Sequence, residues 1–307
     1  MSLGDLEFTG DTKGCGFGIR TLPRSTPDTY HAAMNYVERF QLGLVSNCFL
    51  QQLGAGESLA DLIEKASQFG MDHFELRQTA LGDCEDDSLM PNPERLGKLA
   101  EANKWSSFNL AIAFPFWDVR RSAADPLFAR AREAAQALSP SQPHLRLVDL
   151  DSHFRTIDDL NSRVDHVCSL AESMAATGGL LSIENSPYQS WPMLLSLLQA
   201  CRQQLGNHRQ ALRLCFDPCN LFPAEAELAT GAIRALAGND LSMLHFKQRN
   251  GDGVDVTLCQ GAVDWQDQLS GVAEIGYQGL GLFEITPSED FWSNLKDSVE
   301  YLRAIKK

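Results

Sequence analysis

Leu180-Leu-Ser-Ile-Glu184 is a short apolar run that ends on a carboxylate, and three later runs end on similar side chains: Leu212-Arg-Leu-Cys-Phe-Asp217, Leu241-Ser-Met-Leu-His245 and Leu280-Gly-Leu-Phe-Glu284. Apolar runs of this length that are bounded by turn residues indicate buried strands. Each strand would then carry one metal-ligand side chain at or near its carboxyl end. Three oxygen donors and one imidazole suit a divalent metal that keeps positions open for a substrate.

Strand and helix patterns alternate through the rest of the chain. Further strands are expected over residues 42–48, 73–76, 108–114 and 145–150. Helices are expected over 58–70, 93–103, 124–138, 156–176, 191–205, 223–237, 264–275 and 288–305, with Ser58 and Thr156 as N-caps. Parallel strands need long crossovers, which are usually helical, and eight such units favour a closed barrel. We therefore predict an α/β fold, a (β/α)8 TIM barrel over residues 42–307.

Residues 1–41 are the least regular part and are predicted to form an N-terminal extension. Gly14-Cys-Gly-Phe-Gly18 has the glycine content of a phosphate loop, but no strand precedes it and no Lys-Ser/Thr follows. We interpret it as part of a flexible or capping segment. Residues 28–40 have helical spacing and are expected to cover one end of the main fold.

The net charge and the cysteine content indicate which partners and which cellular compartment to expect. The chain has 307 residues, a formal net charge of -14 and a pI near 4.9. An acidic surface repels nucleic-acid phosphates and anionic lipids, so neither nucleic acid nor membrane is an expected partner. The eight cysteines are scattered, and no signal-peptide pattern opens the sequence. These features favour reduced thiols in the cytoplasm.

Each of the four ligand candidates also has an ordinary structural explanation. Glu184 and Glu284 can form ion pairs at the barrel rim, and Asp217 can cap the turn at Pro218. A single His in an apolar run, such as His245, is usually a core residue. The combination is more specific, because the gaps of 33, 28 and 39 residues between the four each fit one strand-helix unit. The joint pattern therefore favours a metal site.

These residues resemble the xylose isomerase-like barrels, in particular the sugar (phosphate) isomerase/epimerase branch that includes D-tagatose 3-epimerase and the inosose-processing enzymes. The matching sequence segments are Ser182-Ile-Glu-Asn185, Cys215-Phe-Asp-Pro-Cys-Asn220, Leu244-His-Phe-Lys247, Gly261-Ala-Val-Asp-Trp265 and Gly276-Tyr-Gln-Gly-Leu-Gly-Leu-Phe-Glu284. A further match is the stretch from Leu59 to Leu76. The resemblance covers residues 42–305.

The resemblance implies one divalent metal, Mn, Mg, Co or Zn, bound by Glu184, Asp217, His245 and Glu284. It further implies an isomerase or epimerase of carbohydrate metabolism that acts on a sugar, keto-polyol or small hydroxy-ketone through a metal-bound enediolate. Glu184 and Glu284 would then also exchange the proton on opposite sides of the substrate carbon. A dehydratase on the same metal site and a barrel that binds ligands without catalysis are the alternatives.

The chain departs from the branch at two positions: Asn220 stands where a His is common, and Gln248 where an Asp is common. These departures leave the substrate and the stereochemical outcome open more than they do the metal. The expected substrate contacts are Glu75, Phe114, Trp117, Asn220, Lys247 and Arg249. Members of the family that act on apurinic DNA use several zinc ions and many His, whereas only one of the seven His here lies at a ligand position. The sequence is compatible with a homo-oligomer but does not specify one.

Overall fold

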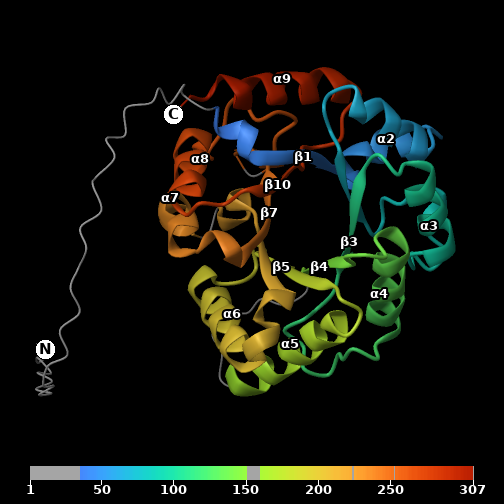
Figure 1. The fold of residues 1–307 in the computed structure, drawn as a ribbon. Coiled ribbons are helices and arrows are strands. Elements are labelled where there is room, and N and C mark those ends of the chain that lie inside the picture. Colours follow the sequence, from blue (N-terminus) through green and yellow to red (C-terminus); the bar gives the residue numbers. More distant parts are fainter. Residues whose placement is uncertain (1–34, 151–159, 223–224, 252, 307) are drawn as a thin grey trace, which may run out of the picture. The chain divides into compact units, whose positions relative to one another are not determined.

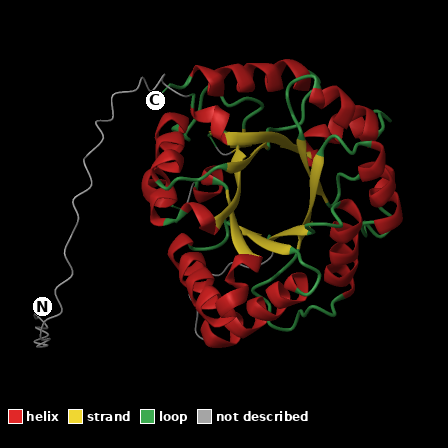
Figure 2. Ribbon diagram, viewed as in Figure 1, coloured by secondary structure: helices red, strands yellow, loops and turns green. Residues whose placement is uncertain are grey.

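A computed structural model describes residues 35–150, 160–222, 225–251 and 253–306. Eight parallel strands within these residues close into a barrel in the order β1-β10-β7-β6-β5-β4-β3-β2 (Figures 1 and 2). The barrel strands are β1 (Phe40–Val45), β2 (His73–Arg77), β3 (Ser107–Ala113), β4 (His144–Val148), β5 (Leu180–Glu184), β6 (Leu212–Phe216), β7 (Leu241–Phe246) and β10 (Gly279–Phe283). The remaining two described strands, β8 (Arg249–Asn250) and β9 (Gly253–Val254), pair as a short antiparallel ribbon.

Helices surround the strands, as Figure 2 shows in red around the yellow barrel. They are α1 (Leu50–Gly54), α2 (Leu59–Ser67), α3 (Pro93–Ala102), α4 (Pro126–Leu138), α5 (Leu160–Ala175), α6 (Trp191–Leu205), α7 (Ala226–Ala232), α8 (Trp265–Glu274) and α9 (Phe291–Ala304). Short 3-10 helices lie at η1 (Tyr36–Arg39), η2 (Ser46–Phe49), η3 (Gly82–Cys84), η4 (Gly206–Ala211), η5 (Pro218–Leu221), η6 (Ile233–Ala235) and η7 (Gly238–Asp240).

The predicted (β/α)8 barrel is confirmed, with every predicted strand present within two or three residues of its expected bounds. The largest shift is at β1, which begins at Phe40 rather than at residue 42 and ends at Val45. The expected strand end at residues 46–48 is instead η2, a 3-10 helix. Residues 1–34, including the Gly14–Gly18 segment, and the N-cap predicted at Thr156 lie outside the described residues.

Local sequence signals explain where several helices begin. The hydroxyl of Ser58 accepts a hydrogen bond from the amide of Asp61 at 3.1 Å, which caps α2 as predicted. Asn92 caps α3 in the same way through the amide of Arg95, and Pro93 takes the first helical position. A side-chain acceptor at the N-cap satisfies an amide that has no partner inside the helix.

Apolar side chains fill the space between barrel and helices in one continuous core. A smaller apolar cluster lies apart from it, built from Val45, Cys215, Met243 and Leu282. The seven cysteines in the described part of the chain form no disulfide with one another. Among the same residues, no helix has both the length and the apolar character required to cross a bilayer.

Candidate metal centre

The four predicted ligands come together at the carboxyl ends of adjacent strands. Glu184 is the last residue of β5, Asp217 follows β6, His245 lies near the end of β7 and Glu284 follows β10. One donor atom from each lies within 4.8 Å of the donors of the other three, and all four residues are buried. The strands are neighbours in the barrel order, so closure of the sheet brings together side chains that are far apart in sequence.

The donor set fits a divalent cation. Within the described residues, the buried His245 Nδ1 makes no hydrogen bond, and the buried Asp217 Oδ2 makes none either but forms an ion pair with Lys247 Nζ at 3.1 Å. Nδ1 instead lies 3.2 Å from Glu284 Oε2 and 3.5 Å from Glu184 Oε1. Buried polar atoms without a partner are rare in native proteins and commonly face an ion or water. Three carboxylates and an imidazole match the preferences of Mn, Mg, Co or Zn.

The local charge balance also favours a cation. Four carboxylates, those of Glu75, Glu184, Asp217 and Glu284, face two cationic side chains, Arg146 and Lys247. With His245 neutral, as coordination through Nδ1 requires, this leaves an excess of two negative charges among buried or largely buried side chains. Uncompensated charge is costly to bury, and one divalent ion would neutralise the excess.

Asp217 divides its two oxygens between structure and the cluster. Oδ1 accepts hydrogen bonds from the amides of Cys219 at 2.8 Å and Asn220 at 3.3 Å, and so caps η5. Oδ2 remains for the cluster, where Lys247 Nζ lies 3.1 Å away. Asn185 fixes the backbone of Asp217, because its side chain accepts from the Asp217 amide and donates to the Asp217 carbonyl, both at 2.8 Å. The capping and metal-ligand explanations of Asp217 are therefore compatible.

Separate partners orient the two glutamates. Asn220 Nδ2 donates to Glu184 Oε1 at 3.0 Å, and Arg146 Nη1 lies 2.6 Å from Glu184 Oε2. Asn47 Nδ2 donates to Glu284 Oε1 at 2.8 Å, and Lys247 Nζ donates to Glu284 Oε2 at 2.9 Å. Each carboxylate thus has one amide and one cation as partners. Because Arg146 pairs with Glu184 and Lys247 pairs with Glu284, each carboxylate is held in its own orientation.

The electrostatic environment keeps both glutamates ionised. Burial alone would raise the pKa of Glu184, but Arg146 and His245 outweigh it and hold this pKa below its usual value. Burial is likewise outweighed at Glu284, where Lys247 and His245 hold the pKa well below normal. At Asp217 burial prevails and raises the pKa, with Lys247 opposing. Ionised carboxylates can both bind a cation and accept a proton.

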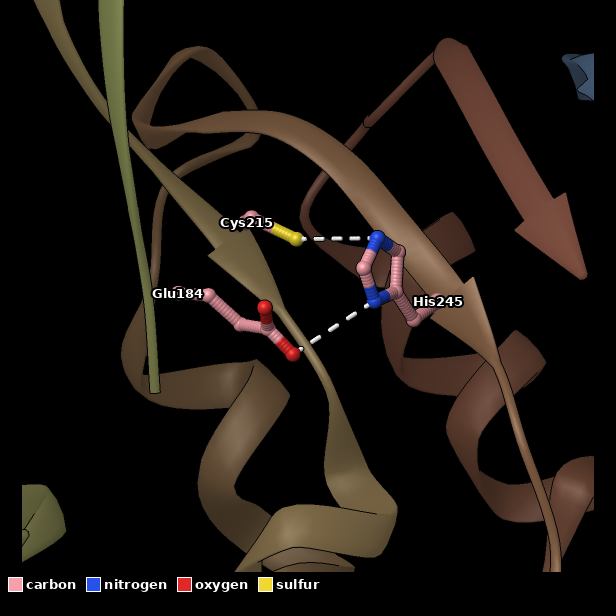
Figure 3. Close-up of side chains that lie close together, drawn as sticks. All are labelled: Glu184, Cys215 and His245. Carbon is pink, nitrogen blue, oxygen red and sulfur yellow. Dashed lines mark hydrogen bonds and ion pairs between the residues drawn. The ribbon is translucent and has the colours of Figure 1, made fainter. Parts of the chain in front are cut away.

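His245 has different neighbours at its two ring nitrogens (Figure 3). Nδ1 faces the glutamates, whereas Nε2 lies 3.3 Å from Cys215 Sγ and 3.4 Å from Glu75 Oε1. Burial would lower the pKa of His245, but Cys215 and Glu184 raise it well above its usual value. A cation that binds Nδ1 must displace any proton held there, so metal binding is coupled to pH.

The other predicted site residues take several positions. Glu75 is fully buried beside Arg146, and Asn220 and Lys247 lie in the cluster itself. Phe114 and Trp117, predicted as a substrate wall, are each 1% exposed. Phe114 packs on Phe128 and Trp117 stacks on Phe116.

The ribbon that follows β7 carries the last of the predicted contacts. Arg249 lies on β8, where its Nε donates to the carbonyl of Gly251 at 3.2 Å. Gln248, one of the two departures from the branch, is buried and bonds both the amide and the carbonyl of Val263. The side chain of Gln248 therefore holds the backbone at Val263, two residues before α8 begins, against the end of β7.

Sequence reasoning missed several residues of the centre. Arg146 and Cys215 lie at its buried side, and Asn47 and Asn185 orient two of the ligands. Arg146 had a visible signal, since a charged residue inside the apolar run His144-Leu-Arg-Leu-Val148 requires a buried partner. The two partners lie on β5, which pairs with β4, and on β2, two strands away, so the run itself does not identify them.

Comparison with known proteins identifies the family. The family model described as "Xylose isomerase-like TIM barrel" matches residues 63–305, and the chain belongs to this family. No match was found among curated proteins.

Solved structures share the fold at low sequence identity. The "IOLI protein with a binding zinc atom" has a TM-score of 0.62 and 17% identity, over 86% of this chain and 95% of that one. D-allulose 3-epimerase from Methylomonas sp., in complex with D-allulose, has a TM-score of 0.62 and 17% identity, over 87% and 97%. A xylose isomerase-like TIM barrel/4-hydroxyphenylpyruvate dioxygenase fusion protein has a TM-score of 0.64 and 14% identity. The match covers 85% of this chain and only 42% of the fusion protein.

Proposed function

We propose that this protein is a divalent-metal-dependent isomerase or epimerase of a sugar or keto-polyol, which works by proton transfer next to a carbonyl. The observation that carries the proposal is the placement of Glu184 and Glu284 around one imidazole nitrogen. Their oxygens lie 3.5 and 3.2 Å from His245 Nδ1, and both side chains are buried. Sugar epimerases among the structural neighbours, one of them crystallised with D-allulose, support the choice of substrate class.

The chemistry follows from the two glutamates. A divalent cation held by Glu184, Asp217, His245 and Glu284 would supply positive charge that offsets the negative charge developing on the substrate oxygens. One glutamate then removes the proton from the carbon next to the carbonyl, and the other returns a proton from the opposite side. Return to the same carbon re-forms the original carbonyl and gives an epimer. Return to the former carbonyl carbon gives an aldose-ketose isomer, and this also requires the proton of the adjacent hydroxyl to pass to the former carbonyl oxygen.

The residues around the glutamates keep them ready for this exchange. Asn220 and Asn47 donate to one oxygen of Glu184 and Glu284 respectively, which fixes the planes of the carboxylates. Arg146 and Lys247 stabilise the ionised forms. Asn220 cannot carry a proton as a His could, so it serves in orientation and substrate binding.

The test is proton exchange in deuterated water. The protein loaded with Mn, Mg, Co or Zn is incubated with a panel of ketoses, aldoses and keto-inositols, and deuterium at the carbons next to the carbonyl is followed by NMR. We expect deuterium in an epimer or isomer, and its loss in E184Q and in E284Q. E133Q, which changes an exposed glutamate of α4, is the matched control and should retain the exchange.

Three outcomes would contradict the proposal. Loss of water from the substrate would indicate a dehydratase. Failure to bind metal in stoichiometric amount would indicate a barrel without this chemistry. Full exchange in E184Q would remove Glu184 from the reaction.

A further inference from the structure

Arg146 joins two carboxylates at the buried side of the metal centre. It lies on β4 and is 1% exposed. Nη1 is 2.6 Å from Glu184 Oε2, and Nε donates to Glu75 Oε1 at 3.1 Å, with Nη2 bonded to the same oxygen. The planar guanidinium is charged at every accessible pH and suits such a bridge better than an ammonium does.

Glu75 is fixed from the other side as well. Asn109 Nδ2 donates to Glu75 Oε2 at 2.8 Å, and Asn109 Oδ1 lies 2.8 Å from His73 Nε2. Glu75 Oε1 is thereby presented to Arg146 and, at 3.4 Å, to His245 Nε2. A carboxylate next to the second nitrogen of a metal-binding His holds the ring in one tautomer and orientation.

The Nε2 side of His245 carries donors of its own. Cys215 Sγ lies 3.3 Å from Nε2, and Glu184, Cys215 and His245 each offer an atom within 4.8 Å of the other two (Figure 3). A thiol, an imidazole and a carboxylate are donors that Zn²⁺ and Cd²⁺ prefer. The imidazole therefore separates two groups of donors, one of hard oxygens at Nδ1 and one that includes sulfur at Nε2.

The two groups differ in how far protein cations already satisfy their carboxylates. At Nδ1, Lys247 is the one cationic side chain among the described residues beside Asp217 and Glu284, and Glu184 Oε1 also faces that nitrogen. On the Nε2 side, Arg146 bonds both carboxylates, Glu75 and Glu184. The guanidinium of Arg146 neutralises Glu75 and forms an ion pair with Glu184 Oε2. Its positive charge would repel a second cation bound by Cys215 and His245 Nε2. Glu184 Oε1, bonded by Asn220, is left to face Nδ1.

We propose that Arg146 is a positioning residue that occupies the place of a second cation, confines the metal to the Nδ1 side of His245 and leaves Glu184 with one oxygen for it. The inference rests on the metal centre of the proposed function, but not on any particular substrate. It assigns Cys215 no ligand role in the intact protein and makes that role available when the guanidinium is removed.

Metal stoichiometry tests this directly. The purified full-length protein is stripped with a chelator and titrated with Zn²⁺ and with Cd²⁺, and bound metal is counted by elemental analysis after dialysis. We expect one ion per chain in the intact protein and two in R146M. R146K retains the positive charge but not the bridge, and should bind one ion with roughly tenfold lower affinity, because Glu184 and Glu75 are no longer held by one planar group.

Cobalt gives an independent readout, because a thiolate bound to Co²⁺ produces a charge-transfer absorption in the near ultraviolet. We expect this band in R146M, and its absence in the intact protein and in R146M/C215S. E75Q/R146M replaces the bridge by a neutral pair and serves in place of R146M if the single variant does not fold. It should also show the thiolate band.

A thiolate band or a second ion in the intact protein would overturn the inference. So would one ion and no band in both R146M and E75Q/R146M. One ion in the intact protein and two in R146M, without turnover of any sugar, would support the role of Arg146 and contradict only the proposed reaction. An intact protein that binds no ion would contradict both.

Discussion

His144 at the start of β4 makes the stability of the barrel depend on pH in a way that can be calculated. Its Nε2 lies 2.7 Å from Ser182 Oγ, and only 7% of the residue is exposed. Burial lowers the pKa of His144 to about 3 from its ordinary value of 6.5. The folded protein therefore keeps this imidazole neutral over a range in which the unfolded chain protonates it. The stability gained by keeping it neutral is complete above pH 6.5 and is lost as the pH falls toward 3.

The magnitude follows from the interval. At pH 5 the unfolded chain lies about 1.5 pH units below the ordinary pKa, and each unit corresponds to about 1.36 kcal/mol. His144 alone should therefore cost the wild type about 2 kcal/mol of unfolding free energy between pH 7.5 and pH 5. In H144Q the amide can still bond Ser182 but does not titrate, so this loss should be absent.

The assay is urea unfolding followed by circular dichroism, on chelator-treated protein so that metal release does not contribute. The unfolding free energies of wild type and H144Q are measured at pH 7.5 and pH 5. H208Q, which changes an exposed His of η4, is the matched control and should follow the wild type. Equal pH dependence in wild type and H144Q would refute the reasoning, because the imidazole would then be protonated in the folded state.

Three further predictions concern the metal and the frame of the barrel. Chelation should lower the melting temperature and Zn²⁺ or Mn²⁺ should restore it, because an ion that binds only the folded state stabilises it; D217N, which weakens the donor set, should show a much smaller shift in differential scanning fluorimetry. G43A should lower the unfolding free energy by about 1–3 kcal/mol, because its Cβ would lie 2.2 Å from the carbonyl oxygen of His73. In the control G54A the new Cβ meets nothing within 4 Å, so the unfolding free energy in the same urea titration should change by less than about 1 kcal/mol. S58A should cost about 1 kcal/mol through loss of the α2 cap, and an unchanged urea midpoint would show that the cap contributes nothing.

The eight strands could be predicted from sequence because each is a short apolar run followed by a turn. Convergence of Glu184, Asp217, His245 and Glu284 followed from the same pattern, since parallel strands in a barrel end at one face. The bounds of β1 were less predictable. Ser46 and Asn47 stand between the apolar residues of β1 and the apolar Cys48 and Phe49, but they belong to η2, from which Asn47 donates to Glu284.

The interior of the barrel could not be predicted. Whether Arg146 meets Glu75, Glu184 or solvent depends on the register of β4 against β5 and on the curvature that brings β2 near β4, which no strand encodes by itself. The environment of Phe114 and Trp117 could not be predicted from sequence either. Aromatic residues after a strand suit either a pocket wall or the core, and the choice depends on the loops above them, where Trp117 donates its amide to Asp149.

The order of the ligands along the chain has a consequence for biogenesis. Glu184, Asp217 and His245 leave the ribosome before Glu284, whose strand β10 lies between β1 and β7 and closes the cylinder. A nascent chain that has not yet reached Glu284 lacks both the fourth donor and the closing strand. We therefore expect a fragment that stops before β10 to gain little or no stability when a divalent metal is supplied, because it lacks one of the four donors and the closing strand.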